Sequence, residues 1–169
     1  MPITRLGYKR LYWQLKYLLS FARWEVAGDL AAARAQGLTT RNLEWRTARE
    51  KQHLIESRIQ DLMNKLATCE VRLSPPQARG QVSFGLFVKV VNSQTRQAAV
   101  YQMVGPYEAD VSAGRLSIDS PVGRVLLGRQ VGDWVTVYAP CGVRRYLVLD
   151  IFQDFDPEAG LQAAGSAGQ

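Results

Sequence analysis

Two long apolar stripes with helical spacing constrain the fold of this chain more than any other feature. The first stripe runs from Leu11 to Ala33 in steps of three or four residues, and the second runs from Trp45 to Cys69 with steps that alternate between three and four. Helices with such stripes bury them against each other, as the a and d positions of coiled coils do. Because both stripes lie in one chain, they predict an antiparallel helical hairpin.

The expected hairpin spans residues 1–73. Pairing the stripes in opposite directions, with Leu11 beside Cys69, centres the chain reversal on a tip at about residues 36–42. Gly37 is suited to end the first helix, because glycine adopts a left-handed backbone without a steric penalty.

Capping residues give the expected bounds of the two helices. Thr4 is a candidate N-cap for a first helix that continues to about Ala35, and Thr39 or Thr40 can cap a second helix that continues to about Val71. No proline interrupts either helix, as an unbroken hairpin requires.

The first helix carries a second set of large side chains on a face next to its apolar stripe. These are the aromatic residues Trp13, Tyr17, Phe21 and Trp24. The preferred interpretation is that the lower part of this set packs on the second domain. The alternative is an exposed strip that binds a partner, since aromatic patches are seldom left bare.

The pattern changes after the proline pair of Ser74-Pro75-Pro76-Gln77, which predicts a linker at residues 74–80. Residues 81–153 then show β-branched and aromatic strand patterns separated by turn residues. The expected strands are residues 82–91, 99–104, 115–118, 134–138 and 146–151. Residues 154–169 are rich in Gly and Ala and lack periodicity, which predicts a disordered tail.

One compact helix is expected within this second domain. Ser120 is its N-cap, Pro121 fits its first turn, and Gly128 lies just past its end. Asp119 places a negative charge near the positive end of the helix dipole. The predicted fold class is therefore α+β, with a long coiled-coil hairpin followed by a small antiparallel β domain that carries one helix.

The positive charge of the chain lies on the hairpin. Residues 1–75 hold 13 Lys and Arg against 7 Asp and Glu, whereas the remainder of the chain holds 8 of each. One interpretation is an ordinary solvated helix surface. The other is an arm that works near nucleic acid or an acidic channel.

Composition argues against several classes of protein. The chain has one histidine, His53, and two cysteines, Cys69 and Cys141, so neither a metal site nor a disulfide framework is indicated. No apolar run is long enough for a membrane span or a signal peptide. We therefore expect a cytoplasmic protein without a cofactor, a metal or a membrane partner.

Three stretches together carry a resemblance to a known family. They are residues 4–18, which begin TRLGYKRL, residues 42–50, which read NLEWRTARE, and residues 101–151, which include SIDSPVGRVLLG. With these motifs the chain resembles the Gre family of bacterial transcription elongation factors up to about residue 152.

This resemblance implies an FKBP-like C-terminal domain that docks on RNA polymerase at the rim of its secondary channel. It also implies that the coiled coil enters the channel and reaches the active site. The docking motif of the family is Asp-Ser-Pro at a helix N-terminus, matched here by Asp119, Ser120 and Pro121.

The chain departs from the family at the tip. Cleavage-stimulating members carry an Asp directly after the tip glycine and a Glu three residues further on, and these carboxylates help to hold a magnesium ion. The corresponding residues here are Leu38 and Arg41, neither of which supplies an oxygen ligand. The tip residues of interest are Leu38, Thr39, Thr40, Arg41, Asn42 and Glu44.

The sequence therefore predicts a polymerase-binding accessory factor, not an enzyme, that enters the secondary channel without stimulating transcript cleavage. Arg41, with Arg34, Arg46 and Arg49 nearby, could pair with the polymerase carboxylates or with nascent RNA, unless local glutamates neutralise them. Three alternatives stay open. They are a true cleavage factor with an atypical tip, an FKBP-like chaperone or isomerase, and a free nucleic-acid-binding protein.

Overall fold

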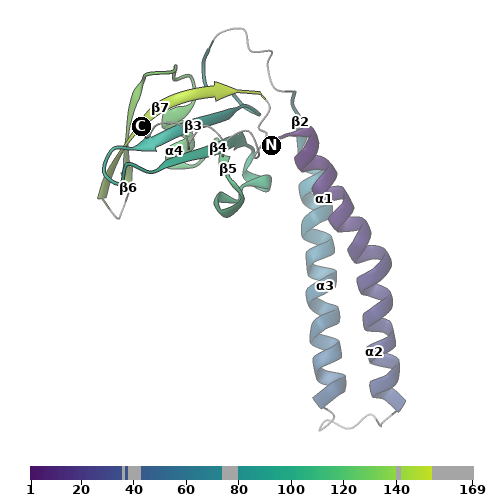
Figure 1. The fold of residues 1–169 in the computed structure, drawn as a ribbon. Helices are drawn as coiled ribbons and strands as arrows, with labels where there is room; N and C mark the ends of the chain where they lie inside the picture. Colours follow the sequence, from purple (N-terminus) through teal and green to yellow (C-terminus); the bar gives the residue numbers. More distant parts are fainter. Residues whose placement is uncertain (36, 38–42, 74–79, 140–141, 154–169) are drawn as a thin grey trace, which may run out of the picture. The chain divides into compact units, whose positions relative to one another are not determined.

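The computed structural model describes residues 1–35, 37, 43–73, 80–139 and 142–153 of the chain. These residues form two compact units (Figure 1). One unit is Arg5–Val71, and the other joins Met1–Thr4 to the chain from Arg72 onward. The predicted α+β fold class is confirmed.

The first unit is a helical hairpin. Its first arm contains α1 (Arg5–Tyr17), a π-helical turn η1 (Leu18–Ala22) and α2 (Arg23–Ala35). Its second arm is α3 (Leu43–Thr68), which runs antiparallel beside the first (Figure 1).

The apolar stripes predicted from the sequence lie between the helices. Val26, Leu30 and Ala48 form a buried cluster on which Trp45 and Ile55 pack. Further along the stripes, the remaining buried positions include Leu11, Ala22, Ile59 and Leu62. The prediction of an antiparallel hairpin is therefore confirmed.

The first arm differs from the single α-helix that we expected. Arg23 N–H donates to the carbonyl of Leu18, five residues back, which makes η1 a π-turn. The stripe from Leu18 to Leu30 advances in three successive steps of four residues. In an α-helix each such step overshoots one turn by about 40°, so the stripe would drift off the seam. A π-turn holds more residues per turn and absorbs this drift.

Ion pairs also join the two arms. The Arg23 guanidinium donates to both carboxylate oxygens of Glu56, at 2.7 and 2.5 Å. Lys51 Nζ lies 3.0 Å from Glu25 Oε1 and 3.1 Å from Asp29 Oδ2. These contacts pair residues whose numbers add to nearly the same value, as an antiparallel hairpin requires.

Helix α3 ends earlier than we expected. It stops at Thr68, and the chain is extended at β2 (Glu70–Val71) instead of continuing as helix to Val71. The next residue, Arg72, donates its backbone N–H to the Ile3 carbonyl at 2.9 Å. An extended chain can form this bond between distant segments, whereas a helix would direct the N–H along its own axis.

The second unit is built on a five-stranded sheet in the order β5-β4-β3-β7-β6. Its strands are β3 (Phe87–Asn92), β4 (Ala98–Val104), β5 (Arg115–Ser117), β6 (Trp134–Ala139) and β7 (Gly142–Phe152). The unit also contains β1 (Pro2–Ile3), the 3₁₀ turns Pro106–Glu108 and Val111–Ala113, and helix α4 (Pro121–Leu126).

Two details of this sheet differ from the sequence prediction. Strand β5 pairs with β4 in parallel, although all strands were expected to be antiparallel. The first strand begins at Phe87 and not at residue 82, because Val82 donates its N–H to the Arg129 carbonyl at 2.8 Å and Gly85 turns the chain with a φ of 85°.

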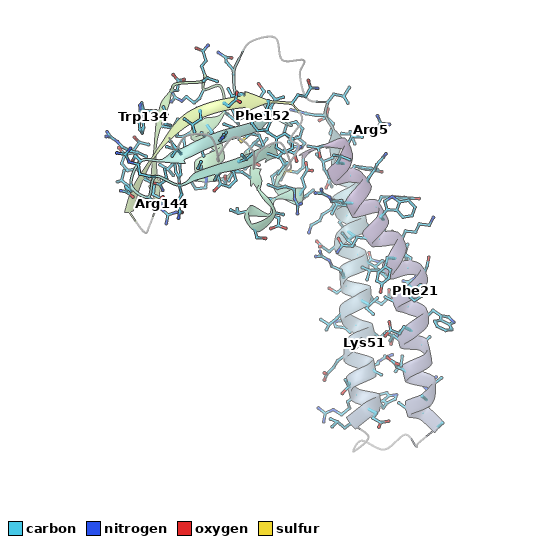
Figure 2. All side chains as sticks on the ribbon, viewed as in Figure 1. Arg5, Phe21, Lys51, Trp134, Arg144 and Phe152 are labelled. Carbon is cyan, nitrogen blue, oxygen red and sulfur yellow. The ribbon has the colours of Figure 1, made fainter. Side chains whose placement is uncertain are left out.

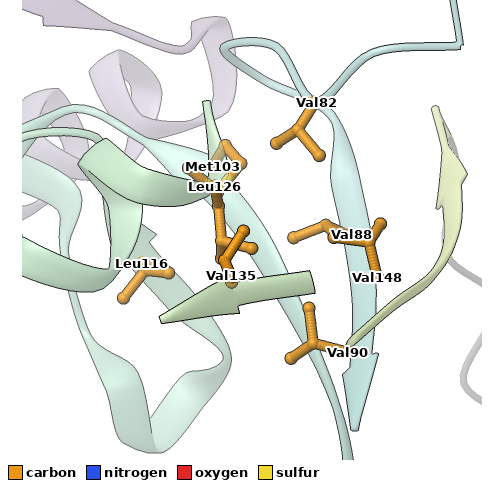
Figure 3. Close-up of a cluster of buried hydrophobic side chains, with 8 residues drawn as sticks. All are labelled: Val82, Val88, Val90, Met103, Leu116, Leu126, Val135 and Val148. Carbon is orange, nitrogen blue, oxygen red and sulfur yellow. The ribbon is translucent and has the colours of Figure 1, made fainter. Parts of the chain in front are cut away.

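The core of this unit lies between the sheet and α4. Leu126 of α4 is fully buried against side chains from β3, β4, β5, β6 and β7 (Figure 3). The buried cluster consists of Val82, Val88, Val90, Met103, Leu116, Leu126, Val135 and Val148. This packing fixes α4, and with it the residues at the N-terminus of that helix.

The first four residues belong with the C-terminal chain, whereas the expected hairpin range of residues 1–73 includes them. The buried carboxylate of Glu108 explains this difference. Its Oε1 accepts the Thr4 N–H at 2.7 Å and the Gly105 N–H at 3.2 Å, and its Oε2 accepts the Thr4 hydroxyl at 2.6 Å.

Candidate functional site

The N-terminus of α4 holds the predicted docking motif in a fixed geometry. Ser120 Oγ accepts the Gly123 N–H at 3.0 Å and donates to the Ser117 carbonyl at 2.7 Å. Asp119 N–H donates to Ser117 Oγ at 3.1 Å. The predicted N-cap role of Ser120 and the position of Pro121 in the first turn are both confirmed.

This edge presents two side chains to solvent. Asp119 and Pro121 are exposed, whereas Ser120 between them is half-buried by its hydrogen bonds. The Asp119 carboxylate is therefore free to contact another molecule while its backbone is held by Ser117. We name Asp119, Ser120 and Pro121 the docking edge.

Gly123 is a positioning residue that our sequence analysis missed. It is buried, and a Cβ at this position would lie 2.0 Å from the Ser117 carbonyl oxygen. Only glycine permits so close an approach of α4 to the end of β5. The sequence signal is a glycine inside a short helix, where it would otherwise lower helix stability.

At the far end of the hairpin, the described residues form a basic surface. Arg34, Arg46 and Arg49 are all exposed. Gly37 has a φ of 106° and donates its N–H to the Arg34 carbonyl at 3.1 Å, as expected for a helix terminator. The predicted tip residues 38–42 lie outside the described residues.

Local neutralisation of these arginines is not observed among the residues that the structure describes. Arg49 donates to the Gln52 side chain at 3.0 Å, and neither it nor Arg34 or Arg46 forms an ion pair there. Glu44, the one tip residue with a described position, is exposed. The described part of the basic surface therefore keeps its positive charge available.

The aromatic set of the first arm is exposed. Trp13, Tyr17, Phe21 and Trp24 show more than half of their surface to solvent. The preferred interpretation, that the lower part of the set packs on the second domain, concerns a contact between the two units and stays a prediction. None of the described helices combines the length and the apolar character needed to cross a membrane.

Comparisons with known proteins place the chain in a family. Residues 1–71 match the model for the N-terminal domain of transcription elongation factors, and residues 76–153 match the C-terminal model for transcription elongation factors GreA and GreB. The chain belongs to the GreA/GreB family. It is accordingly an accessory factor of transcription and not itself an enzyme.

Curated GreA proteins are similar over most of their length. The transcription elongation factor GreA of Syntrophobacter fumaroxidans is 40% identical over 151 residues, which cover 89% of this chain and 97% of that protein. The GreA of Thermodesulfovibrio yellowstonii is also 40% identical, with 89% and 96% covered.

Among solved structures, the GreA factor homolog 1 of Thermus thermophilus is 27% identical, with a TM-score of 0.39 and coverage of 89% of this chain and 97% of that one. The GreA/GreB factor of Nitrosomonas europaea is 22% identical, with a TM-score of 0.40 and coverage of 90% and 98%.

The magnesium ion implied by cleavage-stimulating Gre factors does not fit the side chains of this chain. Magnesium requires oxygen ligands, whereas residues 38 and 41 carry a hydrocarbon and a guanidinium. Within the described part of the chain, no group of three or more His, Cys, Asp or Glu side chains could hold a metal ion.

Proposed function

We propose that this Gre-family chain binds bacterial RNA polymerase in the cytoplasm and regulates transcription without stimulating transcript cleavage. In this proposal the docking edge binds the rim of the secondary channel, and the hairpin enters the channel. Two sequence positions carry the distinction from a cleavage factor. These are Leu38 and Arg41, where a cleavage factor needs carboxylates.

The docking edge supports the first part of the proposal. Asp119 is exposed, and its backbone is held by a hydrogen bond to Ser117 beside a capped helix. Because the backbone that carries this carboxylate is already held, binding to a basic partner surface requires less ordering of the chain, which lowers the entropic cost of binding.

The basic surface at the other end of the hairpin supports the second part. Arg34, Arg46 and Arg49 are exposed without described ion pairs, so their guanidinium groups are available for planar, bidentate contacts. In the complex such contacts suit the catalytic carboxylates of the polymerase or the phosphates of nascent RNA.

A binding experiment with core RNA polymerase tests the docking proposal. Wild-type protein should be retained by immobilised core enzyme, and Asp119→Ala should reduce the affinity by about tenfold or more. Asp150→Ala removes another exposed carboxylate of the same unit and is the matched control. Retention of Asp119→Ala with wild-type affinity would show that the docking edge is not used.

The same complexes then test the absence of cleavage. Stalled polymerase with backtracked RNA should show no faster transcript shortening when wild-type protein is added. Strong stimulation would establish a cleavage factor with an atypical tip. Tight, steeply salt-dependent binding to RNA without polymerase would instead identify a free nucleic-acid-binding protein.

A further inference from the structure

The first arm of the hairpin bears an apolar surface that the rest of the hairpin does not cover, which we name the aromatic strip. It consists of Trp13, Tyr17, Phe21 and Trp24, with exposed fractions of 60%, 57%, 62% and 76%. Each such side chain carries about 150–250 Å² of surface that binding can remove from water. The outer position of Phe21, compared with Lys51 between the helices, can be followed in Figure 2.

The π-turn explains how the strip and the buried stripe coexist on one arm. Ala22, inside η1, and Val26, beyond it, remain buried, whereas the nearby rings of Phe21 and Trp24 are exposed. The exposed rings therefore do not result from a failure of the seam. They lie on a second face of the first arm, whose other face is buried against α3.

Ring geometry distinguishes between classes of partner. Tyr17 and Phe21 stack on each other, with centroids 5.9 Å apart and planes 8° from parallel, and Lys16 Nζ lies 5.0 Å from the centroid of Trp13. Nucleic-acid bases bind to free ring faces. One face of each of these three rings is already used within the strip, which leaves at most one face per ring for a base. The whole exposed area of the strip can instead pack on an apolar protein surface.

The charged side chains around the strip indicate which sign of charge the partner surface carries. Residues 1–24 contain five cationic side chains and no Asp or Glu. Of the five, Arg5, Lys9, Arg10 and Lys16 are exposed on α1, whereas Arg23 bonds Glu56. Two copies that met through this face would bring like charges together, whereas a partner with carboxylates beside an apolar stripe would complement it.

We propose that the aromatic strip is a second protein-binding surface, which binds an apolar, carboxylate-flanked surface of the polymerase. This inference rests on the proposed function, because it places the partner surface on the polymerase that the docking edge binds. The strip and the docking edge belong to different units of the chain. Each can therefore be removed without changing the residues of the other.

Substitution of the exposed rings tests the strip directly. The variant Trp13→Ser with Trp24→Ser should fold as the wild type, since both side chains are exposed, and should bind core RNA polymerase at least about tenfold more weakly. The control variant Leu54→Ser with Met63→Ser removes two exposed apolar side chains from α3, and it should bind with wild-type affinity. Far-UV circular dichroism shows whether each variant keeps the helix content of the wild-type hairpin.

Charge reversal tests the proposed polarity of the partner. Lys9→Glu with Arg10→Glu should weaken binding to the core enzyme by about tenfold at low salt, and by less at high salt where charges are screened. Equal affinities of wild-type and charge-reversed protein would overturn the acidic character of the partner surface.

The possible failures can be told apart. If wild-type protein does not bind polymerase at all, the proposed function fails. If it binds and the strip variant binds equally well, only the present inference is overturned. The inference is also overturned if the strip variant keeps its polymerase affinity but loses binding to single-stranded RNA, or loses a self-association that wild-type protein shows in analytical ultracentrifugation.

Discussion

At the scale of single residues, two glycines and one carboxylate determine how distant backbone segments of the C-terminal unit meet. Gly123 and Gly105 lie where a Cβ would come within 2.0 Å of the Ser117 carbonyl and 1.9 Å of the Pro2 carbonyl, respectively. Glu108 then bonds the Thr4 backbone and side chain. The positions of the docking edge and of the N-terminal segment therefore depend on residues that lie outside both.

Substitution of Gly123 should disturb the docking edge. We expect Gly123→Ala to lower the free energy of unfolding of the C-terminal unit by about 1–3 kcal/mol, because the added methyl group meets a backbone oxygen that cannot rotate away. Urea denaturation measures the loss. Gly28→Ala is the contrasting variant, since its added Cβ meets nothing within 4 Å beyond its chain neighbours and its own helix backbone. It should stabilise α2 by about 0.5–1 kcal/mol. A destabilised Gly28→Ala or an unchanged Gly123→Ala would contradict this account.

Truncation of Glu108 should release the N-terminal segment. Glu108→Ala leaves the buried Thr4 and Gly105 N–H groups without their acceptor, and each unsatisfied group costs on the order of 1–3 kcal/mol. Glu108→Gln keeps one acceptor oxygen and should lose less. Thermal unfolding and hydrogen exchange at Thr4 distinguish the two variants. Equal stability of Glu108→Ala and wild-type protein would refute the proposed anchoring.

At the scale of elements, the first arm of the hairpin carries a buried apolar face and an exposed aromatic face. Its buried stripe is kept against α3 by η1, while the aromatic strip occupies a second face. Cross-helix ion pairs add to this seam. The Arg23 guanidinium bonds Glu56 and lowers the pKa of that carboxyl, and bonding by Lys65 lowers the pKa of Asp61 within α3.

The stability of the hairpin should therefore depend on pH on the acid side. The folded-state pKa values of Glu56 and Asp61 lie below the ordinary values of 4.5 and 3.8. Their contribution is complete above the ordinary values and is lost as the pH falls through the lower folded-state values. Exposure keeps the effect small.

Thermal melting of the hairpin, followed by circular dichroism between about pH 7 and about pH 3, measures this dependence. Glu56→Gln should reduce the decrease in melting temperature that the wild-type hairpin shows as the pH falls. Glu50→Gln, which removes an exposed carboxyl without a described ion pair, should leave the loss unchanged. An identical acid-side loss in Glu56→Gln and wild-type protein would rule out a role for this pair.

At the scale of the whole molecule, the chain combines a hairpin and a sheet domain of the GreA/GreB family with a tip whose side chains differ from those of cleavage factors. The proposed function therefore treats delivery of the hairpin and cleavage chemistry as separable. In the proposal, the docking edge delivers the hairpin, whereas residues 38 and 41 decide whether a metal ion can be held at its end.

Restoring carboxylates at the tip should restore some cleavage. The variant Leu38→Asp with Arg41→Glu supplies two oxygen ligands and removes a positive charge, so it should increase transcript shortening in backtracked complexes above the wild-type level. Leu38→Asn with Arg41→Gln provides a control of similar size without the charges. A carboxylate variant that binds polymerase but leaves cleavage at the wild-type level would show that the two positions are not sufficient.

The sequence by itself determined the hairpin and the docking edge, because both depend on local patterns. A three–four apolar spacing defines the seam of a helix, and Ser120 followed by Pro121 defines a helix start whatever lies around it. The apolar stripe advances by four residues three times in succession from Leu18 to Leu30. This spacing also indicated the π-turn η1, although we expected an uninterrupted α-helix.

Tertiary structure alone decided the contacts between segments far apart in the chain. The Glu108 carboxylate bonds Thr4, which lies 104 residues away, and β5 pairs with β4 in parallel. Neither contact has a local pattern, since a carboxylate on a turn and a three-residue strand suit many partners. The buried state of Gly123 and the exposure of the aromatic strip likewise depend on which surfaces meet, and a residue's own neighbours in sequence do not encode that.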